Sequence, residues 1–318
     1  MLKQHSISVI IPTHNRGYCL PRALHSIDKQ TRLPDQVIVV NDGSTDNTAA
    51  IIQRLKANAP YPVVYIEIPK SGVAKARNLA LDACNTDLIA FLDSDDSFKP
   101  RHLELLATPF SYDSELPLSF CLSNLSKIDL LNIIAQLPSE TLPSNNTYIL
   151  NNAIELLIPG GLFVPSEVMV SAKLAKSIGK FNQKYTHCSD WDFFLRLLIG
   201  NKAGFVNQQL TFRIMGTDSL GKQKKGLTTE KFHLEVCYEK INDKSFFESL
   251  SREQQQKIDS MIEKSLYDYR YGLSEFGIVN YLKSLSDLKR YKNLNYALHP
   301  RALVRACLHS LGLRPKPQ

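Results

Sequence analysis

Short apolar, β-branched runs alternate with helix-like patterns through the first hundred residues, and this alternation limits the possible folds more than any other feature of the sequence. It predicts strands at 7–11, 36–40, 63–68 and 88–92, and helices at 20–30, through 51–55 and at 73–83. The strands are continuously apolar, as expected when helices cover both faces of a parallel sheet. We therefore predict an α/β fold with an open, mostly parallel sheet flanked by helices.

The rest of the chain is less uniform. Residues 110–160 contain several prolines and Asn-rich stretches, which indicate a variable surface with small β elements. Packed structure resumes over 161–215 and includes an apolar-stripe helix at 190–198. Beyond 216 the sequence turns polar and then mostly helical. We expect a main domain at 1–219, divided near residue 100, and a helical C-terminal extension at 220–318.

The net charge of +7 is confined to the end of the chain. Basic and acidic residues are equal in number over 1–219 and over 220–287, whereas 288–318 contains seven Lys/Arg and no Asp/Glu. This distribution argues against a general nucleic-acid surface on the main domain. Within the tail, one predicted helical face carries Leu303, Val304, Cys307, Leu308 and Leu311. Such a helix can lie on an anionic membrane, or it can pack against its own domain with a solvated basic end.

The cysteines and the N-terminal residues indicate the cellular compartment of the protein. The six cysteines are widely spaced and form no Cys-x-x-Cys pair, which favours a reducing cytoplasm over a disulfide or zinc scaffold. The first residues lack a signal-peptide pattern, and the sequence has no apolar run of the roughly 18 residues that a spanning helix needs. We expect a cytoplasmic protein that can associate with the inner face of the membrane.

Polar residues follow three predicted strands, at 13–16, 41–46 and 93–96. In open α/β sheets the carboxyl ends of the strands line the ligand crevice. Asp93, Asp95 and Asp96 are three carboxylates at one strand end, and such hard oxygen ligands select Mg²⁺ or Mn²⁺. Arg77, early in a predicted helix, is suited to attract a diphosphate, and Asp42 is suited to accept hydrogen bonds from a base or ribose. The structural alternatives are an Asp-rich capping turn, a solvent-facing arginine and a turn aspartate.

In order and spacing, these segments resemble the family 2 glycosyltransferases, whose nucleotide-sugar-binding half has the GT-A fold. The similarity extends over about residues 5–215 and rests on four motifs, at 9–16, 39–46, 72–78 and 91–96. Within the second motif, Asn41 stands where the family usually has Asp. The resemblance implies that 1–100 binds a nucleotide sugar and that 101–219 binds the acceptor.

Carried over by position, the resemblance implies a donor site formed by Pro12, Thr13, Asn15, Arg16, Asp42, Gly72, Arg77, Asp93 and Ser94. Asp93 and Asp95 would hold the Mn²⁺ or Mg²⁺. The segment 211–216 resembles the region where many relatives carry Arg-x-His. Met215 replaces that His, which leaves Arg213 as the phosphate contact.

A carboxylate must also take the proton of the attacking hydroxyl. The Ser189-Asp190-Trp191-Asp192 segment resembles the family's Glu-Asp motif, which makes Asp190 the expected base and Asp192 the second candidate. The structural alternative is that Asp190 only caps its helix, where the helix dipole favours a carboxylate. One base and a metal-stabilised leaving group predict inversion at the anomeric carbon.

The resemblance therefore implies an enzyme that transfers sugar from a nucleotide diphosphate donor, most simply a UDP-sugar. The acceptor would be a saccharide or lipid-linked saccharide in the synthesis of cell-surface polysaccharide, lipopolysaccharide or glycolipid. A nucleotidylyltransferase is one rival, although no Gly-rich basic loop follows the first strand. A non-catalytic carbohydrate- or partner-binding protein is the other. The sequence has no Gly-x-Gly-x-x-Gly after a strand, which argues against a dehydrogenase.

Overall fold

The structure is a computed structural model of the 318-residue chain. It describes residues 4–126, 135, 139–143, 146–157, 164–185, 188–214, 235–236, 239–240, 243–274, 278–279, 282 and 300–311. The chain separates into two compact units, Met1–Met215 and Gly216–Gln318, which are considered in turn.

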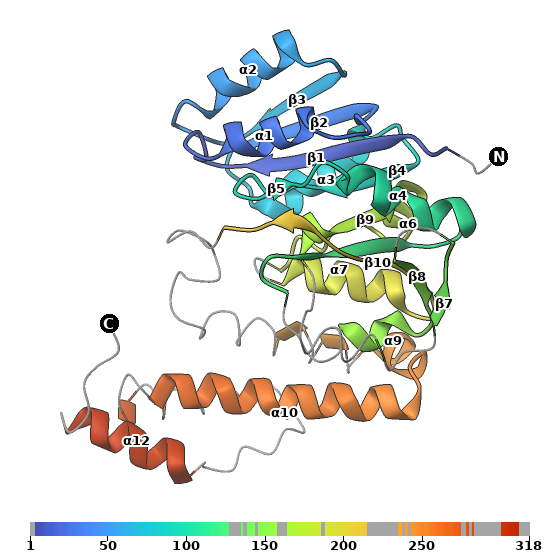
Figure 1. The fold of residues 1–318 in the computed structure, drawn as a ribbon. Helices are drawn as coiled ribbons and strands as arrows, with labels where there is room; N and C mark the ends of the chain where they lie inside the picture. Colours follow the sequence, from blue (N-terminus) through green and yellow to red (C-terminus); the bar gives the residue numbers. More distant parts are fainter. Residues whose placement is uncertain are drawn as a thin grey trace. The chain divides into compact units, whose positions relative to one another are not determined.

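One mixed sheet forms the centre of the first unit (Figure 1). Its strands follow the order β3-β2-β1-β4-β9-β6-β10-β8-β7, with β5 paired to β10. β3, β2, β1 and β4 are mutually parallel, β6 and β10 form a second parallel pair, and the antiparallel β9 lies between β4 and β6. The strands are β1 Ile7–Thr13, β2 Gln36–Asp42, β3 Val63–Ile68, β4 Leu88–Phe91, β5 Ser97–Phe98, β6 Leu118–Ser123, β7 Ser139–Thr141, β8 Thr147–Leu150, β9 Val168–Ser171 and β10 Ala203–Phe212.

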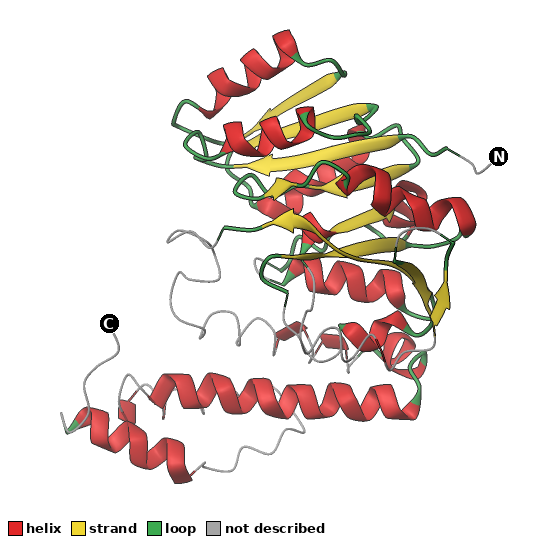
Figure 2. Ribbon diagram, in the orientation of Figure 1, coloured by secondary structure: helices red, strands yellow, loops and turns green. Residues whose placement is uncertain are grey.

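Helices cover this sheet (Figure 2). They are α1 Leu20–Asp28, α2 Thr48–Asn58, α3 Val73–Ala83, α4 His102–Tyr112, α6 Ala172–Ser177 and α7 Ser189–Leu198, with 3₁₀ turns η1 Ala153–Leu156 and η2 Pro165–Glu167. The predicted α/β fold with helices flanking an open sheet is thereby confirmed. The strands and helices predicted in the first hundred residues are present, with boundaries that differ by a few residues at their ends.

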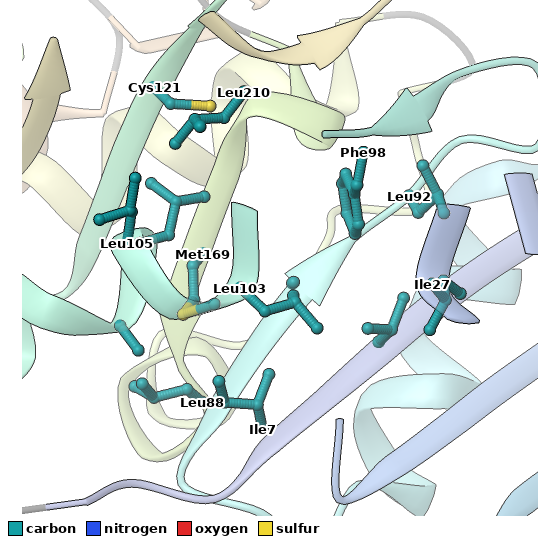
Figure 3. Close-up of a cluster of buried hydrophobic side chains, with 14 of the residues drawn as sticks. Ile7, Ile27, Leu88, Leu92, Phe98, Leu103, Leu105, Cys121, Met169 and Leu210 are labelled. Atoms are coloured by element: carbon teal, nitrogen blue, oxygen red, sulfur yellow. The ribbon is translucent and has the colours of Figure 1, made fainter. Parts of the chain in front are cut away.

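The core follows the two-residue alternation of the strands. Ile7, Val9 and Ile11 join a buried cluster with apolar side chains of α1, α2 and α4, part of which Figure 3 shows. Phe91 on β4 belongs to another aromatic group, with ring centroids 5.5 Å from Phe181 and 6.2 Å from Phe193. Apolar side chains therefore pack on both faces of the parallel strands, which explains their continuously apolar sequence.

The small β elements predicted within 110–160 are present as β6, β7 and β8, but the prediction of a variable surface is wrong for β6. Every residue of β6 is buried, and β6 pairs with β9 on one side and β10 on the other. Its sequence, Leu-Ser-Phe-Cys-Leu-Ser, contains polar residues whose hydrogen bonds are made inside the protein. For example, Ser119 Oγ donates to Leu106 O at 2.6 Å. These internal bonds allow a half-polar segment to form a central strand.

The described part of the second unit is helical. It contains α9 Lys244–Glu248, α10 Arg252–Ser274 and α12 Pro300–Ser310, and α12 packs against α10 (Figure 1). None of the described helices in the chain is long and apolar enough to cross a membrane.

Candidate active site

The order of the parallel strands reverses at β1. The chain adds β2 and then β3 on one side of β1, and it returns to add β4 on the other side. Ligands of open α/β sheets bind outside the carboxyl ends of the strands at such a switch point. β1 ends at Thr13, and Asp93 follows β4, whose Phe91 is in register with Ile10. The first and last polar clusters predicted from the sequence therefore lie at this edge of the sheet.

The loops after β1 and β2 brace each other. Asn15 has a left-handed backbone (φ 50°), and its Oδ1 accepts a hydrogen bond from Thr45 N at 2.7 Å. His14 Nδ1 lies 2.7 Å from Asp42 O. Thr13 is 3% exposed, and its Oγ1 has no hydrogen-bond partner among the described residues. The strand end expected to border the nucleotide is thus rigid and holds an unsatisfied hydroxyl. Pro12 is a buried residue of β1 itself.

Asp42 holds the turn that begins α3. Its Oδ1 accepts from Ser71 N at 2.6 Å and its Oδ2 from Gly72 N at 2.9 Å. Gly72 adopts φ 95° and ψ 155°, a combination that essentially only glycine adopts. A Cβ there would meet nothing within 4 Å, so the backbone angle alone requires glycine. Asp42 and Gly72, both predicted for the donor site, are therefore joined directly by a hydrogen bond.

Two arginines meet the carboxylates after β4. Arg77 Nη2 lies 2.7 Å from Asp93 Oδ1, with the arginine side chain 5% exposed and the aspartate 30% exposed. Arg16 Nη2 lies 3.6 Å from Asp95 Oδ2. Ser94, between the two aspartates, is buried. Arg77 is thus a buried ion-pair partner of the acidic cluster, and the alternative of a solvent-facing arginine is wrong.

Asp96 is the buried member of the cluster. Its backbone N donates to Asp93 O at 2.9 Å, which closes a turn over 93–96. Burial, followed by the negative charge of Asp93, raises the pKa of Asp96 to about 7. Burial is the main cause of this shift, because it disfavours the charged form, and the charge of the nearby Asp95 adds to it. The described residues contain no group of three or more His, Cys, Asp or Glu arranged to hold a metal ion. The carboxylate oxygens of Asp93 and Asp95 are nevertheless the hard donors that a divalent cation such as Mn²⁺ or Mg²⁺ prefers.

Two residues that the sequence did not identify support this cluster, one from η2 and one from the segment before α7. Ser166 Oγ accepts a hydrogen bond from Asp93 N at 3.0 Å, and Ser166 O accepts from Thr211 Oγ1 at 2.7 Å. The guanidinium of Arg77 stacks over the Phe181 ring, 5.3 Å from its centroid. Ser166 is 73 residues from Asp93. No local pattern relates positions so far apart.

The two candidate bases on α7 differ in environment. Asp192 has no exposed side-chain surface and forms an ion pair with Arg196, with Oδ2 at 2.8 Å from Nη2 and 3.0 Å from Nε. Asp190 is half-buried, and its Oδ1 accepts from Trp191 N at 2.9 Å. Asp190 is therefore the less buried of the two residues, whereas Asp192 is fully buried in an ion pair.

Arg213 follows β10 and is fixed through its backbone. Its N donates to Asn124 Oδ1 at 2.7 Å, and its O accepts from Asn124 Nδ2 at 3.1 Å. Its side chain lies 3.5 Å from Glu167, which is 1% exposed and which the sequence did not identify. Burial raises the pKa of Glu167, and the charge of Arg213 opposes that rise. Met215 and Gly216 lie outside the described residues.

A separate cavity of about 510 Å³ lies at the amino ends of the strands. It is lined by the start of β4 and the end of the antiparallel β9, among other segments. The predicted site residues are at the opposite edge of the sheet, so this cavity is distinct from the candidate active site.

Comparison with known proteins gives a family match. The sequence model described as Glycosyl transferase family 2 matches residues 8–116. The chain is 28% identical over 236 residues to hyaluronan synthase of Pasteurella multocida, covering 74% of this chain and 23% of the synthase. It is 28% identical over 197 residues to the uncharacterized glycosyltransferase YwdF of Bacillus subtilis, covering 60% of this chain and 67% of YwdF. The chain thus spans about a quarter of the first relative.

Solved structures share the fold at low sequence identity. S. aureus TarS 1–349 in complex with UDP-GlcNAc has a TM-score of 0.64 and 17% identity, covering 90% of this chain and 81% of that chain. The mannosyltransferase PcManGT from Pyrobaculum calidifontis, in complex with GDP-Man and Mn²⁺, has a TM-score of 0.63 and 16% identity, covering 98% and 81%.

Proposed function

Residues 8–116 make this chain a member of glycosyltransferase family 2, and from that premise we propose that it transfers a sugar from a nucleotide diphosphate donor to an acceptor hydroxyl. The observation that carries the proposal is the meeting of the ends of β1, β2 and β4 at one sheet edge, with Arg77 and Asp93 joined there. In this proposal the buried arginine would attract the diphosphate, and the aspartates would hold a cation.

The donor we propose is a UDP-sugar. The support is the similarity of the fold to TarS, which was solved with UDP-GlcNAc. Because the similar PcManGT was solved with GDP-Man, a GDP-sugar is the alternative donor to test. For the acceptor we propose a saccharide or lipid-linked saccharide used to build surface polysaccharide, lipopolysaccharide or glycolipid. Hyaluronan synthase and chondroitin synthase of Pasteurella multocida, both relatives, are named for polysaccharide synthesis.

Most of the predicted site residues have a part in this proposal. Asp42 holds the turn at Ser71 and Gly72, which would face the nucleotide. Thr13, Asn15 and Arg16, at and after the end of β1, would border the nucleotide. Arg77 holds Asp93 in place, and Asp93 and Asp95 would hold Mn²⁺ or Mg²⁺, which when bound supplies Lewis-acid stabilisation of the departing diphosphate. Arg213 offers a further positive charge at the end of β10.

For the base we propose Asp190. Asp190 is only half-buried, and its Oδ1 accepts a hydrogen bond from the neighbouring backbone N of Trp191. Proton removal by one carboxylate as the hydroxyl attacks the anomeric carbon gives a single displacement, and the product would have inverted configuration. The ion pair of Asp192 with Arg196 supports placing the base at Asp190 and not at Asp192.

The test is a transfer assay with Mn²⁺ and a panel of UDP- and GDP-sugars, in which released nucleoside diphosphate and pyrophosphate are measured separately. Transfer releases the diphosphate; release of pyrophosphate instead would identify a nucleotidylyltransferase. No turnover and no donor binding with any sugar would leave the non-catalytic binding protein as the better description.

Three aspartate variants separate the roles. Asp95→Ala should lose Mn²⁺-dependent donor binding. Asp190→Asn should bind donor normally but transfer sugar roughly 10²–10⁴ times more slowly. The matched control is Asp82→Asn, which removes an exposed ion pair with Lys180 and should leave both measurements unchanged. If Asp190→Asn transferred sugar at the wild-type rate, Asp190 would not be the base.

A further inference from the structure

Helix α12 has one face that packs within its own unit. Ala306 is fully buried in a small cluster with Leu303, Tyr271 and Ile278. The guanidinium of Arg305 stacks over the Tyr271 ring, 4.2 Å from its centroid. Ser310 Oγ accepts a hydrogen bond from Ile278 N at 2.8 Å. These contacts fix the rotation of the helix, and they assign Leu303 to the packed face and not to an apolar membrane face.

A second apolar face of α12 is exposed. Val304 is 58% exposed, Leu311 is 71% exposed, and Cys307 is also exposed. Leu311 N bonds to Cys307 O at 3.0 Å, so the helical path continues to Leu311. Positions separated by three and by seven residues share one side of a helix. The three side chains therefore form a stripe on a side that the packing onto α10 does not cover.

The charge of the segment that contains this stripe favours one kind of partner. Residues 288–318 carry seven basic and no acidic residues, so α12 lies in the most positive segment of the chain. We propose that the exposed stripe of Val304, Cys307 and Leu311 docks on an anionic lipid surface. Apolar side chains would enter the boundary between headgroups and acyl chains, and the basic residues would attract the anionic headgroups.

Other occupants fit these observations less well. A second copy of the chain would bring two segments with the same excess positive charge together across a symmetric interface. A stripe of three side chains is also small compared with a stable protein–protein interface, which buries more than about 1,000 Å². A lipid surface needs no such area, because each basic residue near it increases binding roughly fivefold.

The geometry favours a helix lying along the surface. Eleven residues at about 1.5 Å each give a helix about 16 Å long, which is shorter than the hydrocarbon core of a bilayer. Arg305 is engaged with Tyr271. The docking energy from charge would therefore come mainly from the other basic residues of the tail.

The experiment is co-sedimentation of the full chain with two kinds of vesicle, one of phosphatidylcholine alone and one of equal parts phosphatidylcholine and phosphatidylglycerol. The wild type should bind the mixed vesicles, and binding should weaken as salt is added. The variant Val304→Ser/Leu311→Ser removes the apolar stripe without changing charge and should bind at least about tenfold more weakly. Leu33→Ser, at a 40% exposed leucine of the first unit, is the matched control and should bind as the wild type does.

Circular dichroism would verify that each variant keeps its helix content, and light scattering would give the oligomeric state. The proposal is overturned if the wild type does not bind the mixed vesicles, or if the double variant binds them as well as the wild type. It is also overturned if the wild type is a dimer that the double variant dissociates, because the stripe would then contact a second copy. The vesicle assay uses neither donor nor turnover, so its result is independent of the proposed glycosyl transfer.

Discussion

Replacing Asp96 with asparagine should change how stability depends on pH. Asp96 is 6% exposed, and burial together with the charge of Asp93 raises its pKa from the ordinary 3.8 to about 7. The folded protein therefore binds the Asp96 proton more tightly than the unfolded chain does. A group with a raised pKa stabilises the fold fully below its unfolded pKa, and this contribution disappears as the pH rises through the folded pKa.

The size of the effect follows from the shift. Each pKa unit corresponds to about 1.4 kcal/mol, so the full contribution is about 4 kcal/mol, of which about 3 kcal/mol is lost between about pH 5 and pH 8. The amide side chain in the variant Asp96→Asn would stay neutral at every pH and would resemble the protonated acid. The free energy of unfolding of the variant, measured relative to that of the wild type, should therefore rise by about 3 kcal/mol between about pH 5 and pH 8.

Urea unfolding in EDTA, followed by tryptophan fluorescence, measures this difference. Trp191 is the one tryptophan in the sequence and is 4% exposed, so it reports unfolding of the unit that contains Asp96. Other titrating groups, such as the buried His102, are common to both proteins and cancel in the comparison. Stability profiles that stay parallel within about 1 kcal/mol from pH 5 to pH 8 would refute the reasoning.

Three further substitutions test contacts around the site, each by urea unfolding. Asp192→Asn leaves Arg196 without its carboxylate partner in a buried setting and should cost about 3 kcal/mol; a loss below about 1 kcal/mol would contradict the structural role assigned to this pair. Gly72→Ala forces φ 95° on a residue with a Cβ and should cost about 1–3 kcal/mol, and an unchanged midpoint would show that alanine tolerates this turn. Ser166→Ala removes the acceptor for Asp93 N and should cost about 1–3 kcal/mol, while Ser177→Ala, on an exposed residue, should cost less.

Much of the fold could be predicted because it depends on local pattern. Continuous apolar runs identified β1 to β4, and the spacing of apolar residues identified α1 to α3. The central, buried position of β6 was not predicted, because its polar residues find their partners only inside the folded unit, as Ser119 does with Leu106. A residue-by-residue pattern cannot show where such a partner will be.

The candidate site divides in the same way. Sequence alone placed Asp42 at the end of β2, Arg77 in the helix before β4 and Asp93 directly after β4. The parallel sheet brings the ends of these strands to one edge, where Arg77 and Asp93 form an ion pair. Sequence ranked Asp190 above Asp192 only through the family resemblance, since both lie in the first turn of α7. The structure adds a physical difference between them, because Arg196 pairs with Asp192 and the Asp192 carboxylate is buried.

The amino-acid sequence by itself determined the strand and helix order, the acidic run after β4 and the basic end of the chain, because each depends on neighbours in sequence. Only the tertiary structure decided that Ser166 supports Asp93, that Glu167 accompanies Arg213 and that α12 exposes Val304 but buries Ala306. These contacts join residues that are distant in sequence, or they depend on the rotation of a helix against its neighbour. Their physical basis is packing, which exists only once the chain has folded.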